Sequence, residues 1–389
     1  MNKFKRIIIY IMDGSGCGVQ EDYSKYHEQE SNTLKSVYEN CADLKLPTLE
    51  KLGLKKILFN IEAPNPYCAG MCRTATAGND TYSSVWEMVG VPFEKRFRSE
   101  KKGFEPEFLT EIEAKIGRPI ICNEYIAGFK AMDKYFELHK KTKSPLLYFA
   151  QDGIVLLAAH EGVIHPAKLN IMGKKLSDLL KDKNVVRVIT RPFIGTAGNF
   201  TRSQDRHDYI IVENSFSSSA FGNLWSNNIN LINTEHIANI LGNPEEAQII
   251  NGNFNNNELS LIAKKIIEDE KDQSVTLLCF QDFDTMGHKK DVKAFGEKLK
   301  DFDSFIAKII DKMESTDLLL LTADHGCNPM IDMRGHTREH VPLMFYFKKN
   351  NDKIWLGTRQ TLADIGQTVC NNYNLPEITN GLAIKEIFN

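Results

Sequence analysis

The sequence lacks any apolar run long enough to cross a bilayer, which argues against helices that span a membrane. The longest apolar stretch near its start, residues 7–12, is far shorter than the about 20 residues that such a helix needs. It ends in Asp13-Gly14, so it indicates a buried strand and not the core of a signal peptide. We therefore expect no targeting segment and no membrane partner.

Paired cysteines and excess positive charge are also missing. Of the eight scattered cysteines only Cys68 and Cys72 lie close together, and no second pair completes a zinc site. This pattern predicts reduced thiols in a cytoplasmic protein. A formal net charge of −3 gives no basic face for nucleic acid. The 389 residues suffice for two domains with separate cores, and we expect a monomer.

What the sequence does contain is an alternation of short β-branched runs with helical patterns. Strand-like runs occupy residues 7–12, 185–190, 275–280, 318–322 and 343–347. Residues 291–313 carry apolar side chains every three to four positions, as a helix with one buried face does. Strands alternating with helices predict an α/β sandwich around a largely parallel sheet.

Acidic residues and histidines directly follow three of these predicted strands. Asp13 follows the first strand, Asp284 follows residues 275–280, and Asp324-His325 follows residues 318–322. The carboxyl ends of the strands form the ligand crevice of an open α/β sheet. One crevice can therefore collect residues that lie more than 300 positions apart in the sequence.

Together these strand ends predict a two-metal site. His288 lies four residues after Asp284, and His336 adds a further imidazole after Asp324-His325. Oxygen and imidazole ligands suit Mn²⁺ or Zn²⁺, and a carboxylate-rich site that faces phosphate favours Mn²⁺ or Mg²⁺. Two such ions roughly 3.5–4 Å apart can activate a nucleophile and stabilise displacement at phosphorus. Taken alone, Asp13 is more often a helix cap and His336 an ordinary surface or core histidine.

The middle of the chain carries none of these acidic strand ends. We therefore predict an inserted α/β cap domain over residues 95–213, with the metal-binding catalytic core formed by residues 1–94 and 214–389. Residues 214–257 are rich in asparagine and show no clear periodicity. There we expect the return crossing and a surface loop.

Motifs spread along the whole chain match those of a known family. They are Met12-Asp13-Gly14, Leu46-Pro47-Thr48-Leu49, Ala158-Ala159-His160-Glu161, Arg191-Pro192-Phe193-Ile194-Gly195, Gly198-Asn199-Phe200-Thr201-Arg202, Arg206-His207-Asp208-Tyr209, Thr322-Ala323-Asp324-His325-Gly326 and His336-Thr337-Arg338-Glu339. In these motifs the chain resembles the metal-dependent phosphopentomutases of the alkaline phosphatase superfamily. The resemblance implies an α/β core with two Mn²⁺ ions and a cap that holds a sugar phosphate. Members interconvert the 1- and 5-phosphates of ribose or deoxyribose.

The resemblance also assigns roles to residues of the core. It implies that Asp13, Asp324 and His325 hold one metal and that Asp284, His288 and His336 hold the other. The family nucleophile, itself a metal ligand and phosphorylated in the resting enzyme, is matched by Thr81. A threonine hydroxyl is unreactive at neutral pH, so a metal must lower its pKa. A sugar bisphosphate such as glucose 1,6-bisphosphate primes the family's cycle.

In the cap, the resemblance implies that Arg191 and Arg206 bind the distal phosphate, as planar bidentate donors do well. Asp152 matches a carboxylate near the sugar hydroxyls, and Arg202 lies nearby. The alternative is that these arginines pair with cap carboxylates such as Asp205 and Asp208.

The chain departs from the family pattern around the substrate. Residues 82–85 replace the usual segment after the nucleophile, and Asn79 stands where a lysine is usual. A phosphate-binding lysine falls at His236, and a serine near the sugar is replaced by Ala150. The spacing of Asp284 and His288 is one residue shorter than in most phosphopentomutases. Loss of a charged donor to phosphate costs about 1.5–3 kcal/mol, enough to change which sugar is used.

Four functions therefore remain open. The first is a phosphopentomutase. The second is a metal-dependent phosphatase, or a mutase for a different sugar phosphate, with the same nucleophile and metals. A phosphoglycerate mutase fits the cap motifs less well, and a non-catalytic binding protein is disfavoured because every predicted metal ligand is present.

Overall fold

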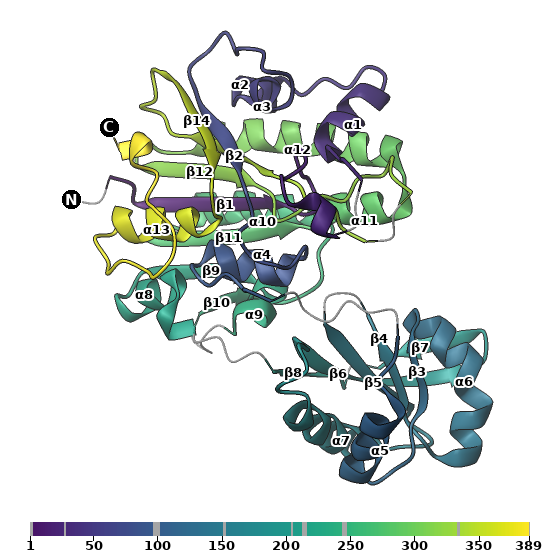
Figure 1. Cartoon of the computed structure of the whole chain (residues 1–389). Coiled ribbons are helices and arrows are strands. Elements are labelled where there is room, and N and C mark those ends of the chain that lie inside the picture. Colours follow the sequence, from purple (N-terminus) through teal and green to yellow (C-terminus); the bar gives the residue numbers. More distant parts are fainter. Residues whose placement is uncertain are drawn as a thin grey trace. The chain divides into compact units, whose positions relative to one another are not determined.

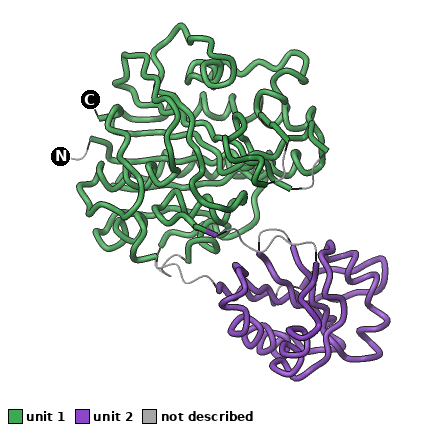
Figure 2. Tube along the Cα trace, viewed as in Figure 1, with its two compact units in different colours: residues 1–94, 215–389 green, residues 95–214 purple. Residues whose placement is uncertain are grey.

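The computed structural model describes residues 3–26, 29–95, 102–150, 153–203, 205–211, 216–242, 247–332 and 335–388. The chain divides into two compact units (Figure 2). The first unit combines residues 1–94 with residues 215–389, and the second comprises residues 95–214. Each unit has a sheet of its own.

The described part of the first unit is built on an eight-stranded sheet in the order β10-β9-β11-β1-β12-β13-β2-β14 (Figure 1). Its strands are β1 (Arg6–Met12), β2 (Tyr67–Cys72), β9 (Asn230–Thr234), β10 (Gln248–Ile250), β11 (Ser274–Phe280), β12 (Asp317–Thr322), β13 (Val341–Tyr346) and β14 (Lys353–Arg359). Neighbouring strands run parallel except at β13, which is antiparallel to both β12 and β2. The sheet is therefore largely parallel, with β1 between β11 and β12.

Helices cover both faces of this sheet. They are α1 (Thr33–Asn40), α2 (Pro47–Lys51), α3 (Leu54–Phe59), α4 (Thr81–Met88), α8 (Ala220–Ser226), α9 (Glu235–Leu241), α10 (Asn256–Asp269), α11 (Asp282–Lys289), α12 (Val292–Lys312) and α13 (Ala363–Asn372), with the 3-10 turns η1 (Tyr23–Tyr26), η2 (Phe216–Ser218) and η3 (Lys385–Phe388). Helices α1, α2, α3, α10 and α12 share one core with alternate residues of the central strands, among them Tyr10, Leu278 and Leu321. Helix α4 contacts α9 and α13, and α13 contacts α8, while α8 and α9 pack on β9, with α9 also against β10 and β11. Strand β1 is buried along its whole length because helices cover both faces of the sheet. This burial explains its nearly continuous apolar sequence.

The second unit is a smaller sheet with helices on it. Its strands are β3 (Ile121–Tyr125), β4 (Leu146–Phe149), β5 (Ile154–His160), β6 (Arg187–Thr196), β7 (Asn199–Arg202) and β8 (His207–Ile210), and its helices are α5 (Pro106–Ile116), α6 (Gly128–Thr142) and α7 (Pro166–Leu179). The path is β3-β4-β5-β6-β7, and β8 pairs with β6. One core packs against α5 and α7 and a second against α6. The unit thus has an apolar interior of its own.

The predicted fold class is confirmed, and one expectation is wrong. The strands expected at residues 7–12, 275–280 and 318–322 are adjacent and parallel. The chain returns to the first unit after residue 214, but the surface loop expected over residues 214–257 is wrong: the described residues there contain α8, β9, α9 and β10, and the two strands extend one edge of the sheet. Elements of three to seven residues are too short to show a period.

Two further findings concern the cysteines and the lengths of the helices. All eight cysteines are free thiols. Among the described residues, no helix has the length and apolar character needed to span a bilayer.

Candidate metal centre

The parallel strands bring three predicted metal-ligating segments to one edge of the sheet. Asp13 follows β1 and Asp324-His325 follows β12, while α11 begins two residues after β11 and carries Asp284 and His288. Strands β11, β1 and β12 are in parallel register, so their carboxyl ends coincide. Asp284 and His288 lie four residues apart on one helix, a spacing that places both side chains on the same face.

The first group of candidate ligands joins Asp13, Asp324 and His325. One ligand atom from each lies within 4.8 Å of the others. His325 Nε2 is 3.5 Å from Asp13 Oδ1 and 3.2 Å from Asp324 Oδ2. All three side chains are almost completely buried. Burial lowers the pKa of His325 to about 4, which keeps the imidazole in the neutral form that binds metals.

The second group centres on Asp284. His288 Nε2 lies 3.3 Å from Asp284 Oδ2, His336 Nε2 lies 3.5 Å from Asp284 Oδ1, and the two histidine nitrogens are 3.1 Å apart. His336 also stacks on His325, with ring centroids 3.8 Å apart. The six predicted ligands therefore form one continuous cluster. Asp284 and His288 also lie close to Cys327, a residue that sequence reasoning did not single out.

The hydrogen bonds of this cluster orient the ligand atoms so that they face one another. His336 Nδ1 donates to the Asn79 carbonyl at 2.6 Å, which leaves Nε2 facing Asp284. Asp324 Oδ1 accepts the backbone N–H groups of Gly14 and His325, both at 3.0 Å. Asp324 Oδ2 and Asp284 Oδ1 are buried and have no hydrogen-bond partner among the described residues.

A divalent cation fits this donor set. Buried carboxylate oxygens without partners are costly unless a cation compensates them. Burial, followed by the nearby Asp324 and Asp284, raises the pKa of Asp13 well above its usual range. Burial also acts to raise the pKa of Asp284, but His336 and His288 outweigh it and the net shift is downward. Bound cations would relieve the repulsion among the three carboxylates.

Close packing of backbone at the centre depends on Gly14. Its φ of +73° lies in the left-handed region, and a Cβ there would be 2.9 Å from Cys327 Cβ. Only glycine lets β1 turn so closely past Cys327 and Asp284.

Thr81 lies beside the first group of ligands. It is the first residue of α4, and its Oγ1 is 3.2 Å from His325 Nε2 and 3.4 Å from Asp13 Oδ1. Asp80 caps this helix by accepting the Ser83 backbone N–H at 2.8 Å. The hydroxyl of Ser84 donates to the Asp324 carbonyl at 2.8 Å. Within the divergent segment 82–85, Ser83 thus takes part in the cap of α4, and Ser84 holds this helix against the loop that carries Asp324.

Buried Arg338 supports the segment that leads to Thr81, a role that sequence reasoning missed. Its guanidinium donates to the carbonyls of Thr74 at 2.9 Å, Thr76 at 2.8 Å and Gly78 at 3.1 Å. It also pairs with both oxygens of Asp22. Arginine is suited to this place because its five donors are fixed in one plane.

Glu87 holds the same segment from the other side. Its carboxylate accepts the backbone N–H groups of Ala75 at 2.8 Å and Thr76 at 2.7 Å, and also bonds Thr361 and Leu362. Residues 74–78 are therefore fixed by one buried cation and one buried anion. The only sequence signals were the motif His336-Thr337-Arg338-Glu339 and the Trp86-Glu87 pair.

The remaining predicted site residues belong to the second unit. Arg206 forms two 2.5 Å hydrogen bonds with Asp208, which is the pairing that the alternative interpretation anticipated. Arg191 on β6 makes no ion pair within the described part of the chain, and its Nε is buried without a partner there. Burial, together with Arg206 and Arg202, lowers the pKa of Arg191 to about 10. Asp152 lies outside the described residues.

Comparison with known proteins places this arrangement in a family. The metalloenzyme superfamily matches residues 5–377. A phosphopentomutase from Clostridium novyi is 32% identical over 98% of this chain and 99% of its own length. The chain belongs to the phosphopentomutase family of the metalloenzyme superfamily.

Solved structures were also compared with this chain. The structure of the PH0037 protein from Pyrococcus horikoshii matches with a TM-score of 0.50 and 14% identity, over 98% of this chain and 100% of that one. Alkaline phosphatase from the Antarctic bacterium TAB5 matches with a TM-score of 0.39 and 12% identity, over 97% and 100%. The first likeness confirms the fold. Membership of the family makes the chain a metal-dependent phosphomutase.

Proposed function

We propose that this phosphomutase is a phosphopentomutase that moves phosphate between the 1- and 5-positions of ribose or deoxyribose. The observation that carries the proposal is the position of Thr81, whose Oγ1 lies 3.2 Å from His325 Nε2 beside the buried carboxylates. Relatedness to a phosphopentomutase at 32% identity supports the choice of substrate.

The proposed cycle uses Thr81 as the phosphate carrier. Phosphothreonine 81 gives its phosphate to the free hydroxyl of the sugar phosphate, a sugar bisphosphate forms, and the other phosphate returns to the Thr81 hydroxyl. Asp80 and Ser84 orient α4, and Arg338 holds the preceding segment. A bisphosphate such as glucose 1,6-bisphosphate would load the threonine first.

Two divalent cations would supply the electrostatic part of this chemistry. When bound, they lower the pKa of a coordinated hydroxyl and neutralise charge on phosphate. We assign one to Asp13, Asp324 and His325 and the other to Asp284, His288 and His336, with Thr81 able to contact the first. Mn²⁺ suits a set rich in carboxylate and imidazole, with Zn²⁺ or Mg²⁺ as the alternatives.

We propose that residues 95–213 form the substrate-binding cap and that Arg191 binds the phosphate that is not being transferred. Its guanidinium is without an ion pair in the described structure and is therefore available to an anion. Arg206 would have to exchange Asp208 for phosphate, and Asp152 would contact the sugar hydroxyls. The eight free thiols support a cytoplasmic enzyme, and we propose that it acts as a monomer.

The test is turnover by the Mn²⁺-loaded chain. Ribose 1-phosphate with catalytic glucose 1,6-bisphosphate should yield ribose 5-phosphate. Thr81→Val, which keeps the shape and removes the hydroxyl, should lower turnover by roughly 10³-fold or more, whereas Thr81→Ser keeps a nucleophile. Peptide mass analysis after bisphosphate treatment should find phosphate on Thr81 in the parent chain and none at this position in Thr81→Val.

A second candidate function is hydrolysis, or transfer on a different sugar phosphate. The divergent segment 82–85 favours it, because these residues directly follow the proposed nucleophile on α4. Release of inorganic phosphate without ribose 5-phosphate would replace the mutase proposal by a phosphatase. A panel of sugar 1-phosphates would show whether another sugar is preferred.

A further inference from the structure

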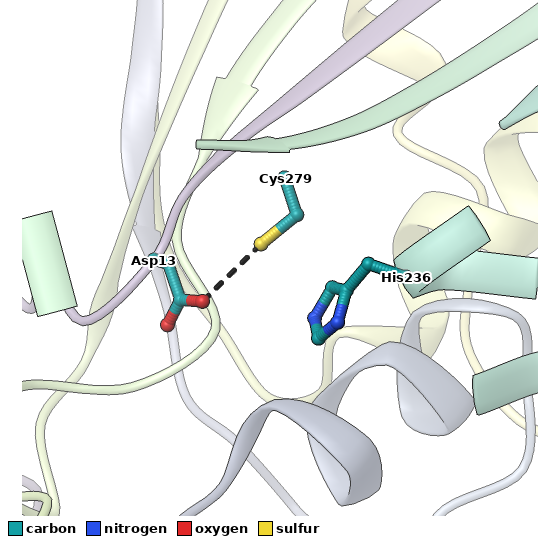
Figure 3. A group of neighbouring side chains, drawn as sticks. All are labelled: Asp13, His236 and Cys279. Atoms are coloured by element: carbon teal, nitrogen blue, oxygen red, sulfur yellow. Dashed lines mark hydrogen bonds between the residues drawn. The ribbon is translucent and has the colours of Figure 1, made fainter. Parts of the chain in front are cut away.

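Three side chains of different chemistry gather on the other side of Asp13. Cys279 lies on β11 and His236 is the second residue of α9. The Cys279 thiol donates to Asp13 Oδ2 at 3.3 Å, and His236 points toward both (Figure 3). One carboxylate oxygen, one ring nitrogen and one sulfur all lie within 4.8 Å of one another. Cys279 and Asp13 are buried, and His236 is half-buried.

The two oxygens of Asp13 face different neighbours. Oδ1 lies near Thr81 Oγ1 and His325 Nε2, at 3.4 and 3.5 Å, and belongs to the metal centre described above. Oδ2 faces Cys279. A carboxylate placed in this way can bind one cation through each oxygen, so the thiol and His236 have access to an anionic ligand that the first cation leaves free.

The donor set distinguishes this site from the metal centre. Thiolate and imidazole ligands favour Zn²⁺, whereas carboxylate-rich sites suit Mn²⁺ and Mg²⁺. In a tetrahedral zinc site, with metal–ligand distances of about 2.0 Å to oxygen and 2.3 Å to sulfur, those two ligand atoms lie roughly 3.5 Å apart. The 3.3 Å between Asp13 Oδ2 and Cys279 Sγ is close to that spacing. Three protein ligands leave a fourth position open.

Buried polar groups on the neighbouring strand support a polar pocket here. Asn233 pairs in register with Leu277, two residues before Cys279, so its side chain lies on the same face of the sheet as the thiol. Asn233 is completely buried, and neither its amide nitrogen nor its oxygen has a hydrogen-bond partner among the described residues. Thr234 Oγ1 next to it is likewise without one. Such groups are normally satisfied by ordered water or an ion. Gln281 Nε2 lies 3.2 Å from His236 Nε2, where the amide donates and the ring nitrogen accepts; for His236 to bind a cation, this amide has to turn its oxygen toward a ring N–H or move away from the ring.

We propose that Asp13, His236 and Cys279 form an additional cation site selective for Zn²⁺, which shares Asp13 with the metal centre. On binding, the Cys279 thiol releases its proton to solvent and the thiolate and neutral imidazole bind the ion. The site goes beyond the proposed function, but it bears on it. Because Asp13 also lies 3.4 Å from Thr81 Oγ1, a zinc ion bound to its other oxygen would add positive charge close to the proposed nucleophile.

The experiment uses the full chain loaded with Co²⁺ as a spectroscopic substitute for Zn²⁺. A thiolate bound to Co²⁺ gives an intense charge-transfer absorption in the near ultraviolet, which oxygen and nitrogen ligands do not. The parent chain should show this band, and Cys279→Ser should lose it. Zinc content measured by elemental analysis should fall by about one ion per chain in Cys279→Ser and in His236→Ala.

Two cysteines serve as matched controls. Cys370→Ser removes another buried thiol of the first unit and should leave both the band and the zinc content unchanged. Cys327→Ser removes the thiol near Asp284 and should also leave the band in place. A band that disappears in Cys327→Ser and persists in Cys279→Ser would put the thiolate ligand in the second group and overturn the proposal. So would equal zinc content in the parent chain, Cys279→Ser and His236→Ala.

His236→Lys separates the two roles open to this position and guards against a misfolded Cys279 variant. It should lose the zinc ion and yet turn over faster than His236→Ala, because the ammonium replaces the charge. If His236→Ala slows turnover with zinc content unchanged, His236 binds phosphate directly and the zinc site is excluded. The band and the zinc count do not depend on turnover, so a chain that makes no ribose 5-phosphate can still pass this test.

Discussion

A buried ion pair joins β1 and β12, the two strands that Asp13 and Asp324 follow. Arg6 at the start of β1 donates to both oxygens of Asp317 at the start of β12, at 2.7 and 2.5 Å, and to the carbonyls of Ile267 and Glu270. Both side chains are almost fully buried. Removing one partner of such a pair leaves an uncompensated charge, whereas replacing both by apolar residues is often neutral.

We predict that Arg6→Met lowers the free energy of unfolding by about 3–5 kcal/mol. The double variant Arg6→Met/Asp317→Leu should recover most of this loss. Urea unfolding of the three chains gives the comparison. If the double variant is as unstable as the single one, the cost comes from the lost bonds to Ile267 and Glu270 and not from the stranded carboxylate.

At this scale the sequence indicated the candidate metal ligands more readily than the residues that support them. Asp13, Asp284 and Asp324 could be found because each follows a strand with an apolar pattern, and strand ends converge by geometry. Arg338 and Glu87 could not be found in this way. Their partners are mostly backbone atoms, and the carbonyls that Arg338 binds lie about 260 residues away in the sequence. No residue type or spacing marks such a contact.

Among the elements, α4 and the segment before it depend most on remote contacts. We predict that Arg338→Met lowers phosphoryl transfer by roughly 10²-fold, because small misplacements of reacting groups cost about that much. The fraction of Thr81 that becomes phosphorylated under fixed conditions should fall in parallel.

Arg73→Gln is the matched control for this variant. Arg73 also contacts Asp22, at 3.6 Å, but its side chain is partly exposed, and surface ion pairs contribute little. Transfer should stay near the parent rate. Equal losses in both variants would mean that Asp22 matters and that the carbonyl contacts of Arg338 do not.

In the second unit, helix α6 contains a histidine whose neutral form is fixed by two backbone groups. His139 Nδ1 donates to the Ser144 carbonyl at 2.6 Å, and Nε2 accepts the His160 N–H at 2.9 Å. Burial, with a smaller effect of His160, lowers the pKa of His139 below its usual value near 6.5. The unfolded chain therefore binds a proton that the folded chain does not. This contribution to stability is complete above pH 6.5 and is lost as the pH falls below that value.

We predict that the second unit loses stability between neutral pH and pH 5, and that His139→Gln flattens this dependence. Glutamine keeps a donor and an acceptor but does not titrate. Hydrogen exchange of the β4 and β5 amides against pH measures the effect. If exchange protection depends on pH equally steeply in the parent chain and in His139→Gln, the pH dependence arises from other groups.

For the whole molecule, the separate cores of the two units predict separate responses to metal. A ligand that binds only the folded state stabilises by about 2.7 kcal/mol when its concentration is 100 times Kd. The candidate metal residues all belong to the first unit. Calorimetry should show two unfolding transitions, and a chelator should lower the temperature of only one. Equal shifts in both transitions would contradict independent cores.

The fold class was largely predictable from the sequence, because the alternation of strand-like and helical patterns indicates an α/β architecture with a largely parallel sheet. The edge formed by β9 and β10 was not, because those strands have five and three residues and lie among asparagines. Their places are set by the pairing of β9 with β11 and of β10 with β9, which no local sequence pattern indicates.

The position of β1 in the sheet has a consequence during protein synthesis. Its two neighbours, β11 and β12, begin at Ser274 and Asp317, so the strand that ends at Met12 leaves the ribosome long before either partner exists. At about 5–20 residues per second, the delay is on the order of tens of seconds. The second unit is complete in sequence at residue 214 and can fold during this interval. An apolar strand such as Arg6–Met12 stays without its partner strands meanwhile, and exposed segments of this kind are prone to aggregate.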